Sequence, residues 1–97
     1  MRPVQLADIE MAARVLMGVA PAARDAVMRD MIIQAQTADA YRRFHGKPHP
    51  RFGSGAVLSC AARQDPVPRP AALGLDALAA YAIVIQTLLA DASYQSS

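Results

Sequence analysis

The chain has few residues of several types, and each shortage excludes a kind of structure or a class of protein. It has one cysteine, Cys60, which cannot form an internal disulfide, so nothing requires an oxidising compartment. Acidic residues interrupt the apolar runs, which are therefore too short for a secretory signal or for the roughly 20 residues of a membrane span. We therefore expect a cytoplasmic protein without a membrane span.

Tryptophan is absent and only five residues are aromatic, so the core must be built from aliphatic side chains, methionine and alanine. Apolar residues make up 54% of the 97 positions and charged residues 19%, which is too apolar for intrinsic disorder. Alanine and leucine favour helix. The composition therefore predicts a single domain over 1–97, an all-α bundle of about four helices.

The formal net charge of +2 is too small to indicate a nucleic-acid-binding protein by itself. The basic surplus gathers after residue 41, but no expected helix carries a run of basic residues along one face. The sequence therefore argues against nucleic-acid binding, although basic residues interleaved with aromatics keep it as a minor alternative.

The spacing of apolar residues predicts four helices, over about residues 8–17, 21–44, 55–64 and 75–92. In the first, the apolar side chains recur at steps of three and four: Leu6, Ile9, Ala13 and Leu16. In the third, Ser54 is placed to cap the amino end. The residues after the fourth, 93–97, are expected to be frayed.

The second expected helix has the clearest signals at both ends. Pro21 suits its first turn, while Gly46 suits its carboxyl cap. Its expected inner face consists of Val27, Met28, Met31, Ile32, Ala35 and Ala38. Acid–base pairs four residues apart, Asp25–Arg29 and Asp39–Arg43, are expected to support it.

The fourth expected helix is apolar on most sides. One stripe consists of Leu75, Leu78, Ala82, Ile85 and Leu89, and a second of Tyr81, Val84 and Leu88. A helix of this kind is normally central in a core or buried against a second copy of itself. We expect it to pack on the long second helix.

The segment from Phe44 to Gly55 concentrates residues that could serve a function. Six potential cations lie within ten positions: Arg42, Arg43, His45, Lys47, His49 and Arg51. A glycine-rich stretch then leads into the third expected helix, whose first amides would be free to bind phosphate or carboxylate. The sequence therefore predicts a candidate anion site formed by Lys47, His49, Arg51, Ser54 and Gly55.

A structural explanation of the same segment is simpler, and we favour it. The cations would stabilise the carboxyl end of the second helix, Phe52 would fill the core, and the glycines would only form the turn.

Metal binding and catalysis are poorly supported. His45 and His49 are four residues apart, but Gly46 and Pro48 keep them off a common helix, and adding Cys60 gives three ligands where structural zinc takes four. The sequence also lacks a nucleophile elbow and phosphate-loop or dinucleotide motifs. We therefore expect no metal, no cofactor, no catalytic residue and no enzymatic activity.

Three segments carry a resemblance: the opening Met-Arg-Pro-Val, residues 38–43, and above all the run His-Pro-Arg-Phe-Gly-Ser-Gly over 49–55. Together they resemble a family of short uncharacterised proteins from Rhodobacter-like alphaproteobacteria. The resemblance implies a small bacterial, cytoplasmic domain, and no activity, cofactor or catalytic residue comes with it.

The leading hypothesis from the sequence is a non-enzymatic interaction or regulatory module, either a homodimer or a subunit of something larger. It rests on the apolar surplus of the helix expected over 75–92, which a domain of this size cannot easily cover alone. The alternatives are a module that binds a small anion or nucleotide through 47–55, and nucleic-acid binding.

Overall fold

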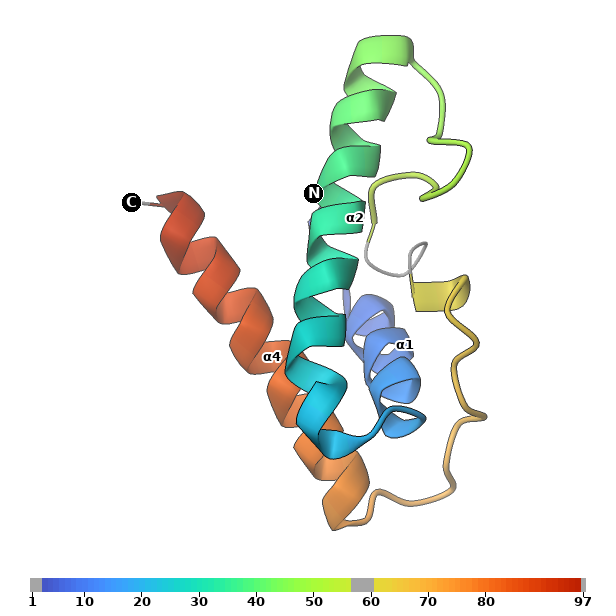
Figure 1. Ribbon diagram of the computed structural model, residues 1–97, viewed down its shortest axis with the longest axis vertical. Helices are drawn as coiled ribbons and strands as arrows, with labels where there is room; N and C mark the ends of the chain where they lie inside the picture. The colour runs from blue at the N-terminus through green and yellow to red at the C-terminus, as the bar shows by residue number, and fades with distance from the viewer. Residues whose placement is uncertain (1–2, 57–60, 97) are drawn as a thin grey trace.

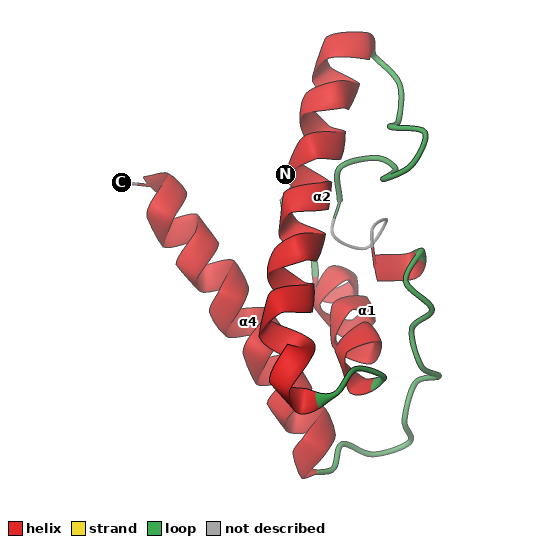
Figure 2. Cartoon of the chain, viewed as in Figure 1, coloured by secondary structure: helices red, strands yellow, loops and turns green. Residues whose placement is uncertain are grey.

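A computed structural model describes residues 3–56 and 61–96, with side chains described up to residue 91 (Figure 1). In these segments the chain forms α-helices α1 (Leu6–Met17), α2 (Arg24–His45) and α4 (Leu75–Ser96), with a 3-10 turn, η1 (Pro21–Ala23), before α2. No strand occurs within them (Figure 2). The expected all-α class is confirmed, with three α-helices in the described segments rather than about four.

The helix expected over 55–64 does not begin where the sequence suggested. Gly55 and Ala56 lie in a loop, and the φ angle of Gly55 is +94°, which is incompatible with a right-handed helix. Residues 57–60 of that expectation lie outside the described segments. Ala61 and Ala62 are helical, and a turn follows at 63–64.

The first helix begins two residues earlier than expected. Gln5 is its amino cap. The backbone amide of Gln5 donates a hydrogen bond of 2.7 Å to the carboxylate of Asp8, as in a capping box. Leu6 is the first residue of α1 and is 81% exposed, so its expected place in the inner stripe is wrong. Ala13 and Leu16 of that stripe are fully buried.

The second helix follows its sequence signals closely. Pro21 opens the 3-10 turn, and Gly46 ends α2 in the left-handed conformation with a φ angle of +72°. The expected ion pairs are confirmed: Arg29 lies 2.8 Å from the Asp25 carboxylate, and Arg43 lies 3.0 Å from that of Asp39.

The core lies where α1, α2 and α4 meet. Of the inner face expected for the second helix, Val27 is half-buried and the other five residues are buried. The fourth helix packs most extensively on α1 and less on α2, and its carboxyl-terminal half diverges from α2 (Figure 1). It also continues to Ser96, so the expected fraying from residue 93 is not seen.

The loop over 46–56 folds back along α2 and comes into contact with its backbone. Gly55 lies so close to Asp39 that a β-carbon on Gly55 would stand 2.7 Å from both the Cα and the Cβ of Asp39. Only glycine accommodates both this approach and the positive φ angle at this position. Gly55 therefore determines how closely the loop can approach α2.

Gly55→Ala is expected to lower the free energy of unfolding by roughly 2–4 kcal/mol, because it adds a steric clash to backbone strain. Gly46→Ala is the matched control: Gly46 also has a positive φ angle, but nothing lies within 4 Å of its added β-carbon, so about 1 kcal/mol is expected. Urea denaturation measures both. Equal losses would contradict the close contact with Asp39.

Candidate functional site

The basic loop is organised around His49. Its Nδ1 atom accepts hydrogen bonds of 3.0 Å from the amides of both Arg51 and Phe52. His49 and Gly53 also exchange two backbone hydrogen bonds, of 2.8 and 3.0 Å. The amides of residues 51–53 are therefore used inside the loop and do not point to a ligand.

Aromatic rings fix the same loop against the end of α2. The His49 ring stacks on Phe52, with centroids 4.8 Å apart, and meets Tyr41 edge-on at 4.8 Å. Tyr41 also lies 4.2 Å from the His45 ring, and Phe52 packs against the core. These contacts support the structural explanation of His49 and Phe52.

The five residues of the predicted anion site take different roles in the fold. Lys47 is exposed, Ser54 is half-buried, and Gly55 is covered by α2. Arg51 lines a cavity of about 270 Å³ together with residues outside the predicted set: Gln34, Phe52, Arg63 and Gln64. Arg63 and the two glutamines carry no sequence motif, so only the folded loop brings them to Arg51.

Potential metal ligands do not gather in the parts of the chain that the structure describes. Within 3–56 and 61–96, no three side chains among histidine, cysteine, aspartate and glutamate lie close enough to hold an ion. His45 and His49 both contact Tyr41. Cys60, the third ligand considered from the sequence, lies outside the described segments.

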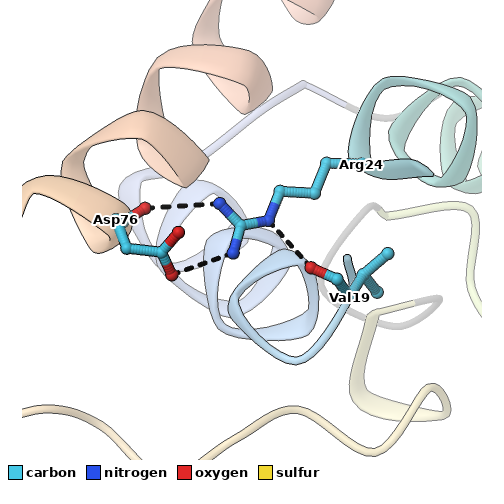
Figure 3. Close-up of polar contacts among 3 residues, drawn as sticks. All are labelled: Val19, Arg24 and Asp76. Carbon is cyan, nitrogen blue, oxygen red and sulfur yellow. Dashed lines mark hydrogen bonds and ion pairs between the residues drawn. The ribbon is translucent and has the colours of Figure 1, made fainter. Parts of the chain in front are cut away.

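A buried arginine joins α2 to the start of α4 (Figure 3). The Arg24 side chain is only 3% exposed, and its Nη2 atom lies 2.9 Å from a carboxylate oxygen of Asp76. Its Nε atom donates to the Val19 carbonyl at 3.0 Å, and Nη1 to the Asp76 carbonyl at 3.5 Å. One guanidinium therefore holds the α1–α2 connection against the first turn of α4.

Two aspartates respond to neighbouring arginines. The hydrogen bond from Arg24 lowers the pKa of Asp76 and outweighs partial desolvation. Burial raises the pKa of Asp39, but opposing contributions that include Arg42 and Arg43 hold it below its ordinary value. Both groups are therefore ionised at neutral pH.

The outer face of α4 carries the first of the two stripes expected from the sequence. We call Leu75, Leu78, Ala82, Ile85 and Leu89 the α4 seam; all five are exposed, Leu75 to 88% and Leu89 to 63%. On the opposite side Ala80 and Val84 are fully buried, with Tyr81 and Leu88 packed beside them. The core thus uses one face of α4 and leaves the seam uncovered.

Comparison with known families identifies one match. The profile of a family described as a domain of unknown function, DUF7742, matches residues 2–88. The chain belongs to this family. Membership confirms that the chain belongs to a family without an assigned activity, as the resemblance implied. Neither the curated proteins nor the solved structures contain a match to this DUF7742 chain.

None of the helices in the described segments of this DUF7742 chain is both long and apolar enough to cross a bilayer.

Arg24→Met is expected to lower the free energy of unfolding by roughly 1–3 kcal/mol, because the Val19 carbonyl and the Asp76 carboxylate lose their donor while the aliphatic volume is kept. Arg29→Met is the control, since Arg29 is an exposed surface partner of Asp25. Thermal unfolding compares the two. A loss no greater than that of the control would contradict the bridging role.

Asp76→Asn is expected to destabilise the protein at pH 7 and to have progressively less effect in acid. Because the folded pKa of Asp76 is lowered, its contribution is complete above the unfolded value near 3.8 and disappears as the pH falls through the folded value. The gap between the two proteins in the free energy of unfolding is measured between pH 7 and pH 2.5. A gap independent of pH would show that the ion pair contributes nothing.

Proposed function

We propose that this protein is a non-enzymatic interaction module whose α4 seam pairs with the seam of a second copy. The observation behind the proposal is that five apolar side chains in a row, from Leu75 to Leu89, are all exposed on one helix. Contiguous exposed apolar surface of this kind is typical of a protein–protein interface.

The spacing of the seam favours another helix as the partner. Its members follow one another at steps of three, four, three and four, which is the heptad repeat of helices that pack side by side. At a rise of about 1.5 Å per residue, the seam is about 21 Å long. A second copy carries a seam of the same length, so the two seams could pack side by side in a symmetric dimer.

The charges around the seam favour a second copy over a charged partner. Residues 77–90 contain no acidic or basic side chain, so two seams can meet without like-charge repulsion. The acids at the two ends already have partners: Arg24 binds Asp76, and the Gln36 side-chain amide donates to the Asp91 carboxylate at 3.1 Å. An apolar seam without charges cannot form ion pairs with a strongly charged surface, so a charged partner is less suited to it.

The absence of enzymatic activity and the cytoplasmic location are two further parts of the proposal. The lone Cys60 supports a reducing compartment. His49 and the backbone amides of 51–53 bond within the loop, which supports a structural rather than a catalytic role for these groups.

Sedimentation equilibrium tests the pairing. The natural chain is expected to dimerise at micromolar concentration, and Ile85→Glu is expected to weaken the dimer at least about tenfold, because pairing would bury a carboxylate without a partner.

Phe44→Glu is the matched control: Phe44 is 86% exposed at the far end of α2, so the same change there should leave the dimer intact. Circular dichroism verifies that both variants are folded. A natural chain that stays monomeric up to several hundred micromolar, or equal weakening by both variants, would overturn the proposal.

A further inference from the structure

Two arginines stand apart from the others in the described segments. Six of the eight arginines there bind a carboxylate or a backbone carbonyl: Arg14, Arg24, Arg29, Arg42, Arg43 and Arg69. Within the same segments Arg51 and Arg63 have neither kind of partner, and both line the same cavity of about 270 Å³. The two arginines without a counter-ion thus lie around one hollow.

The floor of this cavity is polar and held in place. The Gln64 side-chain amide donates to the side-chain oxygen Oε1 of Gln34 at 3.1 Å, and the Gln34 side-chain amide donates to the Asp30 carboxylate at 3.0 Å. These two hydrogen bonds hold both side-chain carboxamides in place and leave the second N–H of each carboxamide available to a ligand. Asp30 is already an acceptor for Gln34 and does not pair with either arginine.

The wall formed by Arg51 and Phe52 is also fixed. The Arg51 guanidinium lies over the Phe52 ring, 5.7 Å from its centroid, a cation–π arrangement that restrains a long side chain. The backbone amides of both residues are bound to His49. The loop is therefore ordered before any ligand binds, which reduces the entropy lost on binding.

We propose that this cavity binds the phosphoryl group of a small phosphate monoester. Two guanidinium groups supply the charge and the paired N–H donors that a phosphate dianion takes. The glutamine amides supply further donors, and the cavity exceeds the volume of a bare phosphate ion, which leaves room for a short organic group. The site keeps Arg51 from the predicted set and adds Arg63, Gln34 and Gln64.

The experiment is an NMR titration with glycerol 3-phosphate, read on the arginine side-chain Nε–H signals at constant ionic strength. Saturable shifts are expected at Arg51 and Arg63, and glycerol alone should cause none. Arg51→Gln and Arg63→Gln should each weaken binding at least about tenfold, because each removes a hydrogen-bonded charge.

Arg29→Gln is the matched control, since it removes the same charge from an exposed residue that already has an acidic partner and should leave the affinity within about twofold. The amide spectrum verifies the fold of each variant. The expected Kd is on the order of 1 mM or below, so the absence of a saturable shift up to about 20 mM ligand would overturn the proposal. Equal weakening by the control would overturn it as well.

Discussion

The structure depends on one constraint: α4 is apolar on two faces, and α1 and α2 can cover only one of them. Ala80 and Val84 insert into the core, which fixes the rotation of the helix about its axis. The Arg24–Asp76 contact fixes its first turn. With both set, the seam from Leu75 to Leu89 has to face outward, because residues three and four apart share one side of a helix.

This constraint connects the size of the chain to its proposed function. A small helical fold buries a smaller share of its surface than a large one, and the described helices leave the outer side of α4 open. Pairing of two copies would close that side. The loop over 46–56 lies on the other flank of α2, so phosphate binding beside Arg51 and pairing through α4 can operate independently (Figure 1).

The sequence predicts most of the fold and little of the candidate site. Periodicity identifies the inner face of α2, and Gly46 marks its end, because both signals are local. Leu6 has the spacing of the inner stripe but is exposed at the first turn of α1, because periodicity does not show how far along the helix the neighbouring helices cover it. Two features join segments that are far apart in the sequence: the Arg24–Asp76 ion pair, and the cavity that Arg51 lines together with Gln34 and Arg63. No local sequence pattern predicts either feature.

The rotation of α4 is the central claim, and solvent paramagnetic relaxation of methyl groups tests it most directly. A soluble gadolinium complex should relax the methyls of Leu78, Ile85 and Leu89 strongly in dilute protein and leave Val84 protected. At higher concentration the three seam residues should become protected, as the second copy covers them. Equal relaxation of Val84 and Ile85, or seam methyls that stay exposed at every concentration, would contradict the account.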